Sequence, residues 1–191
     1  MQLLLDIDNK LCDIIDDIDN PAVNKKAKQD IGLKEADSLE VVNIGPGADV
    51  LVFLVTIATT ALSIWQLPTV IRTGLKDWQW LIDKIKGFAK KEQLVSLDQD
   101  AAGFIAVDYL FEKYDEDSSI QLMDAHTFNI VDVSGMFPGE TRPLAIQPHN
   151  YYVFAFWMGT KKIILSVRST GEIRELESFD DMPYGLTDSR D

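Results

Sequence analysis

One apolar stretch, Val50 to Ile71, constrains the fold of this 191-residue chain more than any other feature. The stretch contains no charged side chain. A membrane-spanning helix needs about 20 mostly apolar residues, so this run is long enough to cross a bilayer. A helix buried in a protein core fits as well, because Thr56, Thr60 and Ser63 recur at helical spacing and form a weakly polar stripe. Both interpretations predict a helix here, and the sequence leaves both open.

The charged residues are distributed unevenly around this stretch. Residues 1–49 hold eleven acids and five lysines, residues 50–95 hold three acids and six basic residues, and residues 96–191 hold seventeen acids and seven basic residues. A basic flank marks the cytoplasmic side of a membrane helix. If the stretch spans a membrane, residues 96–191 therefore lie in the cytoplasm.

The net charge of the chain, −13, limits the partners that it can bind. Such an acidic protein repels the phosphate backbone of nucleic acids and attracts a basic protein. The single cysteine, Cys12, excludes an internal disulfide and a thiolate zinc cluster, and it fits a reducing compartment. The first ten residues lack the positively charged segment of a signal peptide. We therefore expect a cytoplasmic protein, associated with a membrane if residues 50–71 insert into one.

The periodicity of residues 1–95 predicts a mostly helical region. Apolar residues recur at helical spacing from residue 3 to residue 19, which predicts an amphipathic helix with an acidic outer face. Residues 22–38 are polar and leave room for a second short helix, and Leu39 to Ile44 has the composition of a short strand. Lys76 to Lys91 predicts a further helix, with the apolar stripe Trp78, Leu81, Ile82, Ile85 and Phe88.

Residues 96–191 change from a helical pattern to a period of two. Ser96 and Gln99 have the spacing of a capping box, which predicts the start of a helix that ends near residue 114. Tyr151 to Met158 is apolar at odd and even positions alike, as expected for a central strand covered on both faces. The other predicted strands are Ile120 to Met123, Phe128 to Val133, Ile163 to Arg168, and Ile173 to Leu176. The first two of these form either separate strands or one long bent strand.

These patterns predict an α+β chain. Its N-terminal half is helical, and a helix packed on a small antiparallel sheet follows. We divide the chain into a mostly helical region, residues 1–95, built around an apolar central helix at residues 50–71, and an α+β helix-plus-sheet domain, residues 96–191. Residues 134–150 contain two glycines and three prolines, which predicts a long loop inside the second domain.

The C-terminal half carries a pattern that resembles known bacterial modules. The helix opened by SLDQDAAGFIA precedes strands, and the chain continues YYVFAFWMGTKKIILSVRSTGEIREL, with an aromatic strand, a second strand and a TGEI turn into a third. Over residues 96–177 this pattern resembles PepSY-type modules and, equally, the cystatin-like or NTF2-like sheets of some bacterial immunity proteins. The long loop at residues 134–150 departs from the compact pattern. The resemblance implies a binding or inhibitory module and supplies no catalytic residues.

One catalytic hypothesis comes from the start of the chain. LLLDIDNKL, residues 3–11, resembles the first motif of haloacid-dehalogenase-type phosphotransferases, in which one aspartate is the nucleophile and another, two residues later, is the acid and base. The resemblance gives these roles to Asp6 and Asp8. Of the companion motifs there is a later acidic pair, Asp180 and Asp181, and the expected parallel sheet is missing from the pattern. We therefore predict that the chain is not an enzyme.

Three further patterns fall short of a ligand site. The acids of residues 13–19 lack the spacing and the glycine of an EF-hand loop. The Gly-Pro-Gly of residues 45–47 has a valine where the dinucleotide fingerprint places its third glycine. His126 and His149 have no recognisable metal-binding spacing to another ligand. We predict no cofactor and no metal.

The aromatic strand is the strongest candidate for a binding surface. Aromatic side chains supply much of the contact energy at protein interfaces, and acidic residues steer a basic partner towards them. The predicted contact residues are Tyr151, Phe154, Phe156 and Trp157. The function that we predict is a non-enzymatic interaction protein, a bacterial immunity or regulatory protein that binds a basic protein partner. The alternatives are a single-pass membrane protein with a cytoplasmic C-terminal binding domain and, third, a haloacid-dehalogenase-like phosphatase.

Overall fold

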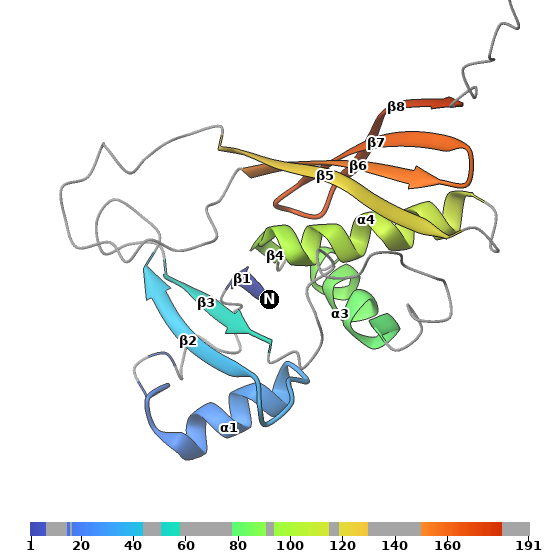
Figure 1. The fold of residues 1–191 in the computed structure, drawn as a ribbon. Helices are drawn as coiled ribbons and strands as arrows, with labels where there is room; N and C mark the ends of the chain where they lie inside the picture. Colours follow the sequence, from blue (N-terminus) through green and yellow to red (C-terminus); the bar gives the residue numbers. More distant parts are fainter. Residues whose placement is uncertain are drawn as a thin grey trace, which may run out of the picture.

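The computed structural model describes residues 1–6, 15, 17–43, 51–57, 78–90, 94–114, 119–129 and 150–180. Within these residues the chain forms two four-stranded antiparallel sheets and three helices (Figure 1). Sheet A contains β1 (Gln2–Asp6), β2 (Ser38–Asn43), β3 (Leu51–Thr56) and β4 (Leu94–Leu97). Sheet B contains β5 (Ile120–Asn129), β6 (Asn150–Met158), β7 (Lys161–Arg168) and β8 (Ile173–Asp180). The helices are α1 (Pro21–Asp30), α3 (Gln79–Lys90) and α4 (Gln99–Lys113).

Sheet A and its two helices follow the chain order β1-α1-β2-β3-α3-β4. The strands lie in the order β2-β3-β1-β4, and every neighbouring pair is antiparallel. This connectivity is the split β-α-β arrangement of ferredoxin-like folds. Ala27 of α1 and Leu81 of α3 share one hydrophobic core with Leu3 and Phe53, so both helices cover the same face of the sheet. Folds of this kind carry many unrelated functions, and the topology therefore does not identify one.

The helix predicted over Val50–Ile71 is wrong for the part that the structure describes. Leu51–Thr56 is strand β3, which lies between β2 and β1. Phe53, Leu54 and Val55 are all buried, so both faces of this strand are covered. A short strand buried on both faces has the same unbroken apolar pattern as a buried helix, and periodicity cannot separate the two. Residues 58–71 lie outside the described residues.

The prediction of a helical N-terminal half is wrong for the same reason. Gln2–Asp6, where the predicted helix over residues 3–19 begins, forms strand β1 in the middle of sheet A. Its three consecutive leucines are all buried, because both faces of this central strand are covered. The helices expected within residues 22–38 and 76–91 are confirmed as α1 and α3. Among the residues that the structure describes, no helix combines the length and hydropathy that a membrane crossing requires.

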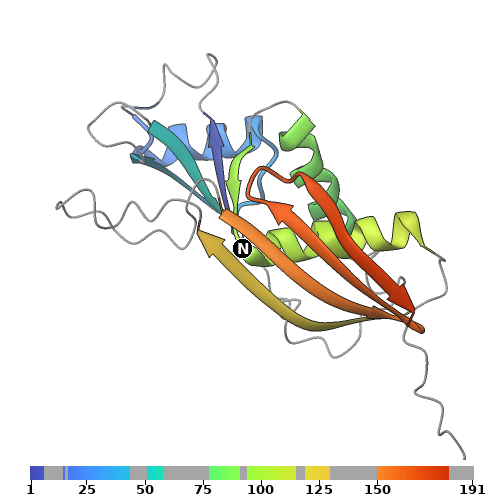
Figure 2. The ribbon, with the colours of Figure 1, turned by 90° about the horizontal axis from the view of Figure 1, so that it is seen from above.

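Sheet B follows the chain as a meander in the order β5-β6-β7-β8. The strands predicted at residues 151–158, 163–168 and 173–176 are confirmed, and β8 continues to Asp180. The two segments predicted between residues 120 and 133 are joined in one strand, β5, as far as Asn129. Helix α4 lies along one face of the sheet, as predicted (Figures 1 and 2).

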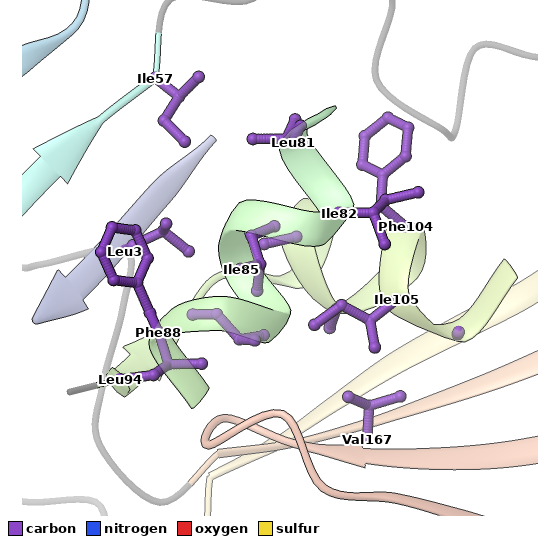
Figure 3. Close-up of a cluster of buried hydrophobic side chains, with 14 of the residues drawn as sticks. Leu3, Ile57, Leu81, Ile82, Ile85, Phe88, Leu94, Phe104, Ile105 and Val167 are labelled. Carbon is purple, nitrogen blue, oxygen red and sulfur yellow. The ribbon is translucent and has the colours of Figure 1, made fainter. Parts of the chain in front are cut away.

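One hydrophobic core joins sheet A, α3, α4 and sheet B. Figure 3 shows Ile85 and Phe88 of α3 beside Leu3 of sheet A, with Ile105 of α4 and Val167 of sheet B on the other side of the cluster. The apolar stripe predicted on α3 is confirmed, since Leu81, Ile82, Ile85 and Phe88 are buried. The core therefore contains residues from both predicted regions of the chain.

Hydrogen bonds at the end of β4 connect the two sheets. The Leu97 backbone N–H donates to the Ser169 carbonyl oxygen (2.9 Å), and the Tyr152 hydroxyl donates to the Leu97 carbonyl oxygen (2.7 Å). Burial raises the pKa of Tyr152 to about 12, so the hydroxyl keeps its proton and remains a donor even at alkaline pH. These bonds fix the position of sheet B relative to the end of sheet A.

Asp98 begins α4 and also binds the N-terminus of the chain. Its carboxylate accepts hydrogen bonds from the backbone N–H of Ala101 (2.8 Å) and from that of Gln2 (2.6 Å). The cap predicted at Ser96 is wrong, because Ser96 is buried in β4 and the helix begins two residues later than the capping-box spacing indicated. One carboxylate therefore caps the helix and holds β1 in place.

Replacing Asp98 by alanine is expected to lower the free energy of unfolding by about 2–3 kcal/mol, because it removes a helix cap and leaves a part-buried N–H without its acceptor. Urea denaturation followed by circular dichroism measures this loss. Asp98→Asn keeps one accepting oxygen, so its expected loss is about 1 kcal/mol.

The burial of Asp98 also predicts how the stability of the fold depends on pH. Burial raises the pKa of Asp98 above its usual value, although the hydrogen bonds that the carboxylate accepts work against this shift. The folded state therefore binds the proton more tightly than the unfolded state does. The stability that this group contributes falls as pH rises from below the usual pKa of Asp98 to above its raised pKa. The Asp98→Asn protein should lose this part of the pH dependence, and an unchanged profile would contradict the assignment.

Candidate interaction surface

Strand β6 divides its side chains between the two faces of sheet B. The buried set is Tyr152, Phe154, Phe156 and Met158. The half-buried set, which alternates with it, is Tyr151, Val153, Ala155 and Trp157. Successive side chains of a strand point to opposite faces, so the buried set faces the core with α4 and the other set faces away. We call the face that carries Tyr151 and Trp157 the outer face.

The four predicted contact residues are split between these faces. Phe154 and Phe156 are 0% and 1% exposed, and their rings stack in the core with centroids 5.9 Å apart. A partner cannot reach them while the sheet is packed on α4. Tyr151 and Trp157 lie on the outer face and stay candidates. The expectation that β6 is covered on both faces stays a prediction, since its outer-face side chains are half-buried and no helix or strand among the described residues lies over them (Figures 1 and 2).

Exposed hydrophobic side chains gather on sheet B. In the described part of the chain, five large hydrophobic side chains are exposed, and Trp80 of α3 is the one that lies elsewhere. The four on the edge strands of sheet B are Met123, Phe128, Leu176 and Phe179. Phe128 pairs directly with Tyr151, and Phe179 lies two strands away from Trp157 in the same cross-strand row. Phe128 and Phe179 therefore lie on the outer face at opposite corners, whereas Met123 and Leu176 are the extra residues of the bulges in β5 and β8.

The register of sheet B arranges the outer face in four rows that run across the strands. One end row contains Phe128, Tyr151 and Arg168, and the other contains Gln121, Trp157, Lys162 and Phe179. The middle rows contain His126, Val153, Ser166 and Arg174, and then Asp124, Ala155, Ile164 and Glu177. The outer face therefore has small and aliphatic side chains in its centre, aromatic side chains at both ends, and charged or polar side chains along β5 and β8.

Two cations lie over the aromatic rings of the central strand. Lys162 Nζ lies 4.9 Å from the centroid of the Trp157 ring, and the guanidinium carbon of Arg168 lies 5.3 Å from that of Tyr151. The indole N–H of Trp157 also donates to the Gly159 carbonyl oxygen (2.6 Å). Cation–π contacts and this hydrogen bond hold the rings in place. Little side-chain entropy is therefore lost when a partner binds them.

The charged side chains along the margins are partly paired with one another. Glu172, in the turn between β7 and β8, lies 2.8 Å from both Arg168 and Arg174. The hydrogen bonds from these two arginines lower the pKa of Glu172, and the bond to Glu172 raises the pKa of Arg168. On β5, His126 Nε2 lies 3.0 Å from the Asp124 carboxylate. All of these contacts are exposed to water, so they can be exchanged for contacts with a partner at small cost.

The backbone edges of sheet B are less suited to binding than its outer face. β5 contains a bulge between Leu122 and Asp124, and β8 contains one between Glu175 and Glu177. A bulge interrupts the regular row of hydrogen-bonding groups and twists the strand, which hinders the addition of another strand. The outer face is therefore the candidate site.

The structure does not assemble the other residues that the sequence singled out. Asp6 ends β1 in sheet A, whereas Asp180 ends β8 in sheet B, and both sheets are antiparallel. Asp8, Asp181, His149, residues 45–47 and most of residues 13–19 lie outside the described residues. Among the side chains that the structure describes, no group of three or more metal-ligating residues is placed to hold a metal ion.

Sequence reasoning missed the contributions of β5 and β8 to the outer face. A bulge shifts the alternation of a strand by one residue. Counting residues from Ile120 therefore does not give the face of the sheet on which Phe128 lies. Phe179 lies beyond the end predicted for its strand. A signal was present in β5, where Asp124, His126 and Phe128 alternate with less polar or smaller neighbours.

Comparison with known proteins adds no relative to this description. No protein-family model matches the chain, and neither a curated protein nor a solved structure matches it. The resemblance of residues 96–177 to PepSY-type and immunity modules therefore stays a prediction.

Proposed function

We propose that this chain is a non-enzymatic interaction protein that binds a basic protein partner through the outer face of sheet B. The observation that carries the proposal is that exposed Phe128 and Phe179 share the outer face with Tyr151 and Trp157, a face over which no described helix or strand lies. Aromatic residues held in fixed orientations are the usual anchors of protein interfaces. The net charge of −13 attracts a basic protein over a longer range than these contacts do.

The resemblance of residues 96–177 to bacterial immunity modules gives the proposal its specific form. Such a chain acts by occupying a surface of another protein. The outer face needs no bound group to do this, since aromatic and aliphatic side chains supply the contact area and the margins of β5 and β8 supply polar contacts.

The proposal is tested by replacing Phe128 with a photo-crosslinking amino acid in the native host. Phe128 is 55% exposed on the outer face, so a bound partner lies within reach of the crosslinker. We expect a covalent adduct with another protein, identified by mass spectrometry as a basic protein. Adding Tyr151→Ser and Trp157→Ser should reduce the adduct about tenfold or more, because both anchors are lost. Raising salt to about 1 M in an extract should also reduce it, since the Debye length falls to about 3 Å.

The matched control is the same crosslinker at Trp80. Trp80 is the exposed aromatic residue of α3, 38% exposed, and Lys34 lies over its ring as Lys162 lies over that of Trp157. It should give no adduct with the same partner. Adducts that form equally well from Trp80, or that persist after both anchors are removed, would overturn the proposed contact surface. An acidic partner, or an adduct that is insensitive to salt, would overturn the electrostatic part.

A further inference from the structure

In the two middle rows of the outer face, the residues at the two ends of one row are basic and those at the two ends of the other row are acidic. Arg174 and His126 stand at the two ends of one row, and Glu177 and Asp124 stand at the two ends of the next. All four side chains are exposed, with Arg174 at 70% and Asp124 at 63%. On both β5 and β8, the basic side chain therefore lies in the first of these rows and the acidic side chain in the second.

This order makes the outer face complementary to itself. A two-fold axis that crosses the strands at right angles, midway between the two rows, places β8 of one copy over β8 of another and β5 over β5. Arg174 of each copy then lies opposite Glu177 of the other, and His126 lies opposite Asp124. An axis along the strands would instead place Asp124 opposite Glu177, which are like charges. Of the two two-fold axes that align the strands of the two sheets, the charge pattern thus selects the one that crosses them.

We infer that a second copy of this chain packs against the outer face of sheet B, with the strands of the two copies antiparallel. The inference rests on the proposed function, because it takes the outer face as the contact surface. It adds the regulation of that surface. The homodimer covers the outer face, and a basic partner has to compete with the second copy for it.

The apolar groups match under the same axis. Tyr151 of one copy lies opposite Trp157 of the other, at both ends of the contact, and the small residues of the middle rows meet in its centre. Sheets that pack in this way lie about 10 Å apart, with their strands within about 30° of each other. The exceptions are Phe128, which lies opposite Gln121, Phe179, which has no residue of these rows opposite it, and Arg168, which lies opposite Lys162. Each of these cations already lies over the ring of its own neighbour, so neither needs a new partner.

The homodimer is expected to be weak. Four strands spaced about 4.8 Å apart make a small contact area, and two chains of net charge −13 repel each other. Interfaces at the low end of the size range are transient. We expect a dissociation constant on the order of 10 µM, so that the dimer forms at high protein concentration and dissociates on dilution.

A charge exchange between rows tests this arrangement. The purified full chain is studied by sedimentation equilibrium from about 1 µM to about 300 µM, a range that brackets the expected dissociation constant. Arg174→Glu places acids opposite acids twice in the dimer, and Glu177→Arg places cations opposite cations twice. Each variant should therefore weaken the homodimer about tenfold or more. An equimolar mixture of the two variants should restore the dimer, because every opposed pair then has opposite signs again.

Lys25→Glu is the matched control. Lys25 is exposed on α1, and this substitution changes the net charge by the same amount as Arg174→Glu. It should leave the dimer unchanged, and circular dichroism checks that all variants are folded. A wild-type chain that stays monomeric over the whole range would overturn the inference. So would a dimer that survives both single exchanges, or a mixture that fails to associate.

These results are separable from the test of the proposed function. The purified chain contains no other protein, so a monomer contradicts the homodimer alone and leaves the crosslinking result to decide about the basic partner. A charge-sensitive homodimer without any adduct to another protein in cells would contradict the basic partner alone.

Discussion

Replacing Phe154 by alanine is expected to lower the free energy of unfolding by about 3–5 kcal/mol, the usual cost of removing a fully buried phenylalanine ring. Phe154 is 0% exposed and stacks on Phe156 in the core between sheet B and α4. The substitution leaves a cavity that neighbouring side chains fill incompletely. Urea denaturation followed by circular dichroism gives the loss as a shift of the midpoint with little change of slope.

Trp157→Ala on the same strand is the matched control. It removes a larger ring from the outer face, where the side chain is half-buried, together with the hydrogen bond to Gly159 and the contact with Lys162. We expect a loss of about 1 kcal/mol. If Trp157→Ala costs as much as Phe154→Ala, the outer face is covered in the folded chain and cannot serve as a docking surface.

Lys86→Met is expected to lower the free energy of unfolding by about 2–3 kcal/mol, because it leaves the carboxylate of Asp108 without its cation. Lys86 of α3 forms an ion pair with Asp108 of α4, which is 4% exposed, and another with Glu112 at 2.8 Å. Burial lowers the pKa of Lys86, but the two carboxylates outweigh this effect and raise it. Because Lys86 itself is 37% exposed, water reaches the pair, and we place the loss below that of a fully buried one.

The double variant Lys86→Met/Asp108→Leu separates loss of the pair from loss of packing. Apolar side chains of similar volume often replace a buried ion pair without loss of stability. The double variant should therefore be more stable than Lys86→Met alone, and the two substitutions should couple by about 1 kcal/mol or more. Effects that simply add would mean that Asp108 does not depend on Lys86.

Those elements whose pattern allows a single interpretation could be predicted from the amino-acid pattern alone. The stripe of α3 recurs at a spacing of three and four residues, which no strand reproduces, and α3 lies where that stripe predicts it. Strand β6 followed by the Gly159 turn and the alternating β7 was likewise readable, because the turn residue and the period of two agree. The net charge that favours a basic partner also belongs to the sequence.

The other elements could not be predicted, because packing between distant parts of the chain sets which face of an apolar segment is covered. Leu51–Thr56 and Gln2–Asp6 each lie between two strands of sheet A and have buried side chains on both faces, and a local pattern contains no information about those neighbours. The same limit applies to the aromatic strand. Phe154 and Trp157 are both aromatic residues of strand β6. Because α4 covers one face of sheet B, the Phe154 ring lies in the core, whereas the Trp157 ring is half-buried on the outer face.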